Sequence, residues 1–258
     1  MKDGTLIIPE IVEKDGEKYR VISIDEGTFE YNYEIKEIVL PESIQKIGKN
    51  AFNNCTVLTN IVIPANVLID NNAFQYCTAL ETLTINENVI INENAFIGCS
   101  SLKEVIIKDN TIVEKNAFQY CTALNNIIFT GTADIQEAAF LGCTGIETIK
   151  LPNGLSAIRK SVFNNCSNLK TVEIPSTVET IEAEAFMYCS LLNTINIPNS
   201  VTTIENDAFN NCNNLELTIP NSVTNIGRNA FAYMQRIYYN GTATYEEDNL
   251  YWGAFNLN

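Results

Sequence analysis

The sequence predicts an α/β repeat protein, a solenoid in which each coil adds one short strand to a parallel sheet. Three observations predict this fold. A phenylalanine recurs every 22 to 24 residues along the 258-residue chain. A cysteine stands three residues after most of these phenylalanines, and all seven prolines share one other position of the repeat. Because self-similarity at such a period is typical of solenoids, we expect one stack of about eleven coils.

The phenylalanine series runs from Phe29 to Phe255, and of the twelve phenylalanines only Phe129 lies outside it. A single coil cannot bury its own apolar side, so stacked coils must share one continuous core. We therefore expect a buried column whose central members are Phe52, Phe74, Phe96, Phe118, Phe140, Phe163, Phe186 and Phe209.

The elements of one repeat can be predicted from the stretch AFNNCSNLKTVEIPSTVETIEAEAF. The alternation at Val172 and Ile174 predicts a short strand with one face inward. Pro175 has no N–H and ends this strand. Val178 and Ile181 predict a second, shorter extended piece that also points inward. The segments EAEAF and NNC predict a helical or 3₁₀ turn that brings the chain back to the next coil.

Three parts of the chain differ in regularity. Residues 1–28 are interpreted as an N-terminal cap, in which Asp15-Gly16 between alternating apolar runs predicts a hairpin that covers the first coil. Residues 29–230 are repeats of 22 or 23 residues. Residues 231–258 are an atypical C-terminal repeat, which we interpret as truncated because the chain stops within the repeat.

The cysteines stand in one phase, one in each of eight coils, beside the phenylalanine column. We interpret them as small apolar residues that fill the core; cross-linking and redox chemistry are the alternatives. Replacing one by serine is expected to destabilise the fold by about 1–3 kcal/mol, because the hydroxyl would be buried without a partner. The predicted core cysteines are Cys55, Cys77, Cys99, Cys121, Cys143, Cys166, Cys189 and Cys212.

Composition excludes several classes of function. The formal net charge of −15 argues against binding to nucleic acid, which is itself anionic. No apolar run is long enough to cross a membrane, so no direct membrane insertion is expected. Histidine is absent, and the sequence has no C-x-x-C pair and no glycine-rich phosphate loop. We therefore expect a protein that is not an enzyme and has no cofactor and no metal site.

One strand position points outward between two inward ones and forms a predicted column on the sheet. Val, Ile and Thr dominate its first half, and Lys150, Glu173, Asn196 and Thr218 make the second half polar. An exposed apolar stripe indicates an interaction surface, although the β-propensity of these residue types explains the pattern equally well. The predicted ligand-binding residues are Ile7, Val39, Val62, Thr84, Ile106, Ile128 and Tyr238.

The repeat follows the motif L-x-x-I-x-I-P-x-x-V-x-x-I-x-x-x-A-F-x-x-C, and residues 191–212, LLNTINIPNSVTTIENDAFNNC, carry nearly all of it. This motif resembles the BspA-like class of leucine-rich repeats. The resemblance implies a right-handed, horseshoe-like leucine-rich-repeat solenoid with its parallel strands on the concave face. It also implies an extracellular or cell-surface protein that binds a protein or a glycan, often in adhesion to a host or another cell. The alternative is a structural spacer or stalk within a longer surface protein.

Overall fold

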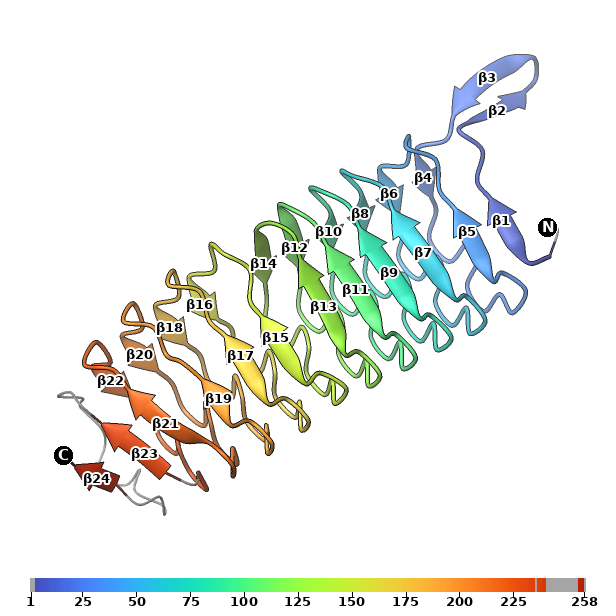
Figure 1. Cartoon of the computed structure of the whole chain (residues 1–258). Coiled ribbons are helices and arrows are strands. Elements are labelled where there is room, and N and C mark those ends of the chain that lie inside the picture. The colour runs from blue at the N-terminus through green and yellow to red at the C-terminus, as the bar shows by residue number, and fades with distance from the viewer. Residues whose placement is uncertain (1–2, 235, 240–254, 258) are drawn as a thin grey trace.

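The computed structural model describes residues 3–234, 236–239 and 255–257. Figure 1 shows an elongated stack of coils whose axis runs nearly straight in this view. Each regular coil contains a longer strand, here called the first strand, and a shorter second strand on the opposite side of the core. The described residues include no helix that could span a membrane.

The first strands pair in parallel, as predicted, but they form three successive sheets. The first sheet contains β1 (Thr5–Ile7), β5 (Glu37–Val39), β7 (Asn60–Ile63), β9 (Thr82–Ile85), β11 (Glu104–Ile107) and β13 (Asn126–Phe129). The second contains β15 (Thr148–Lys150), β17 (Thr171–Glu173) and β19 (Thr194–Ile195). The third contains β21 (Glu216–Ile219), β23 (Arg236–Tyr239) and β24 (Phe255–Leu257).

The second strands confirm the predicted shorter extended piece, and they form two parallel sheets. One contains β4 (Ser23–Ile24), β6 (Lys46–Ile47), β8 (Leu68–Ile69), β10 (Ile90–Ile91), β12 (Thr111–Val113) and β14 (Ala133–Ile135). The other contains β16 (Ala157–Ile158), β18 (Thr180–Ile181), β20 (Thr203–Ile204) and β22 (Asn225–Ile226). Both kinds of sheet are therefore interrupted between the coil of β13 and β14 and the coil of β15 and β16. The first strands are interrupted again between β19 and β21.

The return segment of each coil is a series of hydrogen-bonded turns, so the predicted helical or 3₁₀ turn is wrong. In one coil, Asn116 and Tyr120 on either side of Phe118 have φ of 58° and 60°. Left-handed residues occur singly and do not continue a right-handed helix. Each short turn therefore closes with one hydrogen bond between residues three positions apart, such as that from the N–H of Cys121 to the carbonyl of Phe118, at 3.2 Å. The described residues contain no helix.

The phenylalanine column is confirmed as the centre of the core. Ten rings from Phe29 to Phe231 stack in sequence, with neighbouring centroids 5.0 to 6.0 Å apart and planes within 16° of parallel. The eight central rings are fully buried. Phe255 was expected in this series, but it lies in β24 opposite Ile237 of β23. These two paired positions are 18 residues apart, fewer than the 22 or 23 of a regular repeat. Phe255 therefore occupies a strand position of the repeat and not the position of the stacked phenylalanines.

The N-terminal hairpin forms as predicted from β2 (Ile11–Lys14) and β3 (Glu17–Arg20), which pair antiparallel. These two strands pair only with each other, their residues are exposed, and Figure 1 shows the hairpin projecting from the stack. It is an insertion between β1 and β4 and does not cover the first coil. The two solenoid sheets begin with β1 and β4, before residue 29. Most of the atypical C-terminal repeat, residues 240–254, lies outside the described residues.

Candidate functional site

The predicted outward column is a continuous row on the first sheet, here called the outer column. Ile7 pairs with Val39, Val62 with Thr84, and Ile106 with both Thr84 and Ile128. The alternation within each strand orients these side chains outward, because their neighbours such as Ile61 and Ile63 are buried. Four members are exposed and two, Thr84 and Ile106, are half-buried; the six are Ile7, Val39, Val62, Thr84, Ile106 and Ile128.

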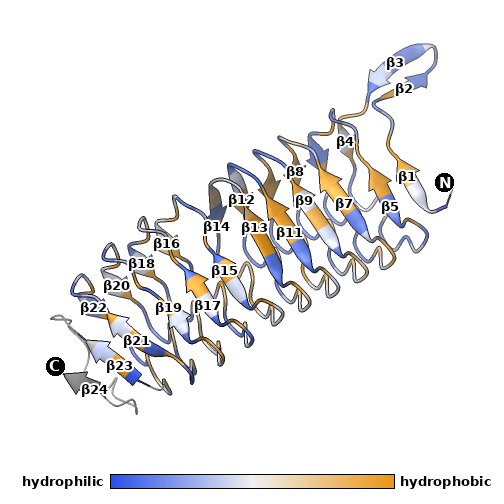
Figure 2. Ribbon diagram, viewed as in Figure 1, coloured by the Kyte–Doolittle hydropathy of each residue, from blue (hydrophilic) through white to orange (hydrophobic). Residues whose placement is uncertain are grey.

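The apolar part of the column ends where the first sheet ends. In the second sheet the same row continues as Lys150 opposite Glu173, which form an ion pair at 3.5 Å. Figure 2 shows hydrophobic colours on β7, β11 and β13 and paler or hydrophilic colours on β19, β21 and β23. Tyr238 lies opposite Thr218 in the third sheet, apart from the other predicted members. The structure therefore gathers six of the seven predicted binding residues.

A polar border runs along the start of the same strands. Lys103 pairs with Glu81 of the preceding coil at 3.0 Å, and the amide of Asn126 donates to Glu104 at 2.7 Å. Exposed ion pairs of this kind add little stability. These pairs instead give the surface its character: charged and polar groups lie beside the apolar outer column.

A hollow of about 490 Å³ adjoins the end of the outer column at Ile128 and Lys150. It arises because the Thr130–Thr132 loop turns towards the preceding coil. Asp109 accepts bonds from the backbone N–H and the hydroxyl of Thr132, both at 2.7 Å. These bonds from Thr132 lower the pKa of the Asp109 carboxyl. The loop is therefore bonded to the preceding coil, and the hollow lies between the loop and the following coil.

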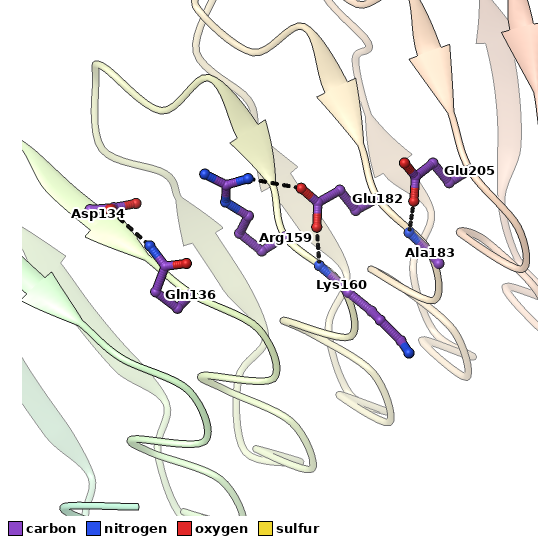
Figure 3. Close-up of polar contacts among 7 residues, drawn as sticks. All are labelled: Asp134, Gln136, Arg159, Lys160, Glu182, Ala183 and Glu205. Atoms are coloured by element: carbon purple, nitrogen blue, oxygen red, sulfur yellow. Dashed lines mark hydrogen bonds and ion pairs between the residues drawn. The ribbon is translucent and has the colours of Figure 1, made fainter. Parts of the chain in front are cut away.

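A second hollow of about 500 Å³ lies on the other side of this loop, against the second strands. Arg159, part of its lining, forms an ion pair with Glu182 at 3.0 Å (Figure 3). The other carboxylate oxygen of Glu182 accepts the backbone N–H of Lys160 at 2.9 Å, and Glu205 bonds Ala183 in the equivalent way at 3.0 Å. These carboxylates hold neighbouring coils together.

The cysteines are buried and carry free thiols. Each Sγ donates to the carbonyl of the phenylalanine in the preceding coil; the Cys121 Sγ, for example, lies 3.3 Å from the oxygen of Phe96. Burial raises the pKa of Cys121, and that of Cys55 to about 11, which disfavours the reactive thiolate. The thiols are therefore structural, and the serine hydroxyl that was expected to lack a partner would have one here.

Two features of the site were not predicted: the hollows and the thiol ladder. The replacement of the usual proline by Thr130-Gly131-Thr132 marks the loop in the sequence, but the bond to Asp109 depends on the contact between coils. Among the residues that the structure describes, no three His, Cys, Asp or Glu side chains are grouped so that they could hold a metal ion.

Comparison with known proteins identifies relatives. The chain matches the model of the BspA type leucine-rich repeat region over residues 18–125 and 111–238. Among solved structures it is similar to a leucine-rich repeat protein from Bacteroides ovatus (21% identity, TM-score 0.54, 93% of this chain and 82% of that chain covered). It is also similar to the pneumococcal vaccine antigen PcpA (19%, 0.52, 92% and 72%).

A leucine-rich cell surface protein from Faecalibacterium prausnitzii aligns at 24% identity with a TM-score of 0.49, covering 91% of this chain and 81% of that chain. A search of curated proteins found no match. At these identities the two structures with TM-scores above 0.5 show the fold alone, whereas the repeat model spans most of the sequence. The chain therefore belongs to the BspA-type leucine-rich repeat family.

Proposed function

We propose that this chain is a non-catalytic binding module of a secreted or cell-surface protein, and that the outer column binds another protein, as in adhesion to a host or another cell. The observation that carries the proposal is the row from Ile7 to Ile128, which keeps four exposed apolar side chains and the half-buried Thr84 and Ile106 in register across six strands. The location is the one that membership of this repeat family implies.

The geometry of the outer column suits a protein partner. Exposed apolar rows next to polar groups are typical of interfaces, where an apolar centre is surrounded by a polar rim. Here the rim includes the Lys103–Glu81 pair, and the hollow beside Ile128 could accept a projecting side chain. The inner strands of this sheet form backbone hydrogen bonds with a neighbouring strand on each side, which fixes their backbone. Little conformational entropy is therefore lost when a partner binds.

A binding screen with a matched pair of variants tests the proposal. The purified chain is screened against arrayed extracellular proteins and glycans, together with Ile106→Glu/Ile128→Glu. Two buried carboxylates in an apolar interface should weaken binding of the partner at least about tenfold. The control is Asn196→Glu/Thr218→Glu, which adds the same charge in the polar half of the same column and should leave binding unchanged.

Retained affinity in Ile106→Glu/Ile128→Glu, at an unchanged melting temperature, would show that the outer column is not the binding site. If no arrayed protein binds, the proposal of a binding module fails and the alternative, a spacer or stalk in a longer surface protein, is favoured.

A further inference from the structure

The turns that follow the ladder phenylalanines form a surface without charge. We call this surface the turn edge and define it as the six residues after each phenylalanine in eight coils: 53–58, 75–80, 97–102, 119–124, 141–146, 164–169, 187–192 and 210–215. None of these residues is Lys, Arg, Asp or Glu, although the chain has 16 basic and 31 acidic residues. These turns run along the lower side of the stack in Figure 1, where each leads into a first strand.

Tyrosines recur on this edge, two residues after the phenylalanine. Each is about half exposed, from 45% to 57%, and has φ between 56° and 62°. This left-handed backbone suits glycine and asparagine, and a bulky residue there is an outlier. Other coils do place Asn54, Gly98 or Asn165 at the same position. The turn therefore does not need the ring. Those on the turn edge are Tyr76, Tyr120 and Tyr188; Tyr31 and Tyr233 have the same position in the coils of Phe29 and Phe231, outside the turn edge, where the turns also carry charged residues.

Two of these rings pack against glycines of the next coil, where a side chain would clash with them. A Cβ on Gly98 would lie 2.4 Å from Cδ1 and 2.6 Å from Cε1 of Tyr76, and a Cβ on Gly142 would meet Tyr120 at 2.5 and 2.7 Å. Each ring therefore lies against the backbone of the next coil, and about half of the residue's surface remains open to solvent. A ring held in this way loses little rotamer entropy when a ligand stacks on it.

The rings repeat at the spacing of two coils. The centroids of Phe74 and Phe96 are 5.0 Å apart and those of Phe96 and Phe118 are 5.3 Å apart, so Tyr76 and Tyr120 stand on coils about 10 Å from each other. In an extended β-1,4-linked glycan each sugar is about as long as one coil is thick, and alternate sugars present the same face.

Hydroxyl groups flank the tyrosines and complete the surface. Thr122 and Thr144 follow the cysteine of their coils, and each donates to a carbonyl of the preceding coil, at 3.5 and 3.4 Å. Their oxygens keep lone pairs that can accept bonds from sugar hydroxyls. Rings for the apolar faces of sugars and neutral acceptors for their hydroxyls stand together on this edge, and no charge there would have to be desolvated.

We propose that the turn edge binds an extended, uncharged β-1,4-linked glycan, with Tyr76 and Tyr120 stacking on alternate sugars. This surface is separate from the outer column and goes beyond the function proposed above. Because the contacts involve no charge, binding should be insensitive to salt.

Affinity electrophoresis tests this proposal with three neutral polymers. The chain should be retarded in native gels that contain hydroxyethyl cellulose or glucomannan and should migrate normally in soluble starch, whose α-1,4 links do not give the extended repeat. Migration unchanged by both β-1,4-linked polymers would overturn the proposal. Equal retardation in starch would overturn it as well, because the spacing would then play no part.

Variants identify the surface. Tyr76→Asn/Tyr120→Asn should weaken the binding of cellohexaose about tenfold or more in calorimetry, and asparagine suits this backbone because other coils already have it. The control Tyr19→Asn removes an exposed tyrosine of the N-terminal hairpin and should bind normally, as should Ile106→Glu/Ile128→Glu. Unchanged affinity in Tyr76→Asn/Tyr120→Asn, or lost affinity in the control, would contradict the site.

Discussion

At the scale of the residue, cysteine and phenylalanine act as a pair across coils. The Cys121 thiol donates to the carbonyl of Phe96 in the coil before, while the ring of Phe118 stacks on that of Phe96 with centroids 5.3 Å apart. The carbonyl of Phe96 would otherwise depend on the turn bond from the N–H of Cys99 alone, at 3.3 Å. The thiol is small and apolar enough for the core, yet it gives this buried oxygen a second donor.

Substitution of Cys121 can separate filling of space from hydrogen bonding. We expect Cys121→Ser to be at least as stable as Cys121→Ala, because its hydroxyl can donate to Phe96 and such a bond is worth about 1 kcal/mol. Urea denaturation of both variants measures this difference. If the thiol only filled space, alanine would be the more stable variant, since it buries no polar group.

The thiols also predict how stability depends on pH. Burial raises the pKa of Cys55 to about 11 and raises that of Cys121 and Cys189 well above its usual value of 9.0. Above about pH 9 an unfolded thiol loses its proton while a folded one keeps it, so the free energy of unfolding falls as the pH rises. Below about pH 8 both states are protonated and this contribution is fully present.

Denaturation at several pH values between about 7.5 and about 10 checks this expectation. In the upper part of this range, each thiol that stays neutral in the fold should lower the free energy of unfolding by up to about 1.4 kcal/mol per pH unit. In Cys121→Ala the free energy of unfolding should fall less steeply with pH, by the contribution of one thiol. An identical dependence in that variant would mean that Cys121 ionises in the folded state.

At the scale of the element, one irregular loop sets where both kinds of sheet are interrupted together; the further break between β19 and β21 affects only the first strands. The interruption falls between β13 and β15 and between β14 and β16, next to the Thr130–Thr132 loop. That loop bends towards Asp109, and Gly131 allows the approach, because a Cβ there would lie 2.5 Å from Oδ1 and 2.8 Å from Cα of Asp109. The neighbouring coil, which contains β15 and β16 and contributes six residues to the lining of the second hollow, has no strand pairing with the coil of this loop.

Gly131→Ala should therefore destabilise the protein by about 1–3 kcal/mol, because the new methyl group meets backbone atoms that cannot move freely. The free energy of unfolding in urea measures the effect. Thr130→Ala, an exposed position in the same loop, is the control and should change stability by less than about 0.5 kcal/mol. Equal effects from the two substitutions would show that the contact with Asp109 is not tight.

At the scale of the whole molecule, the core is continuous but the ladders are not. The phenylalanine stack crosses the interruption with Phe140 and Phe163 at 5.9 Å, among the widest spacings of the series. Since each coil contacts only its neighbours, stability is a sum over coils and interfaces. The interface between the coils of Phe140 and Phe163 lacks strand pairing on both sides and is the weakest point for the two parts to separate.

Native-state hydrogen exchange should detect this weak interface. We expect the amides of β13 and β15 that face the gap to exchange faster than those of β9 and β11, and we expect the two parts of the solenoid to lose protection at different denaturant concentrations. Equal protection across β9 to β17, lost in one step, would show that ring stacking and the hydrogen bonds of the turns, such as that from Phe140 to Val162, couple the coils fully without strand pairing.

Much of the fold could be predicted from residues whose role is local. Phe52 to Phe209 and the cysteines repeat in one phase, and Pro175 ends a strand whichever coil it occupies, so their positions follow from sequence periodicity. The predicted helical return failed because left-handed residues such as Asn116 and Tyr120 stop a helix. The register of the outer column was predicted for all seven residues, since Tyr238 lies opposite Thr218 as expected, but the interruptions that put Tyr238 in a separate sheet could not be predicted.

The sequence by itself determined the repeat, the buried phenylalanine and cysteine columns and the side of each strand that faces outward, because each depends on a short-range pattern repeated coil after coil. Only the tertiary structure decided where the ladders break, which carbonyl each thiol meets and which tyrosine lies over which glycine. These are contacts between residues 20 or more positions apart, whose geometry depends on how one coil sits on the next.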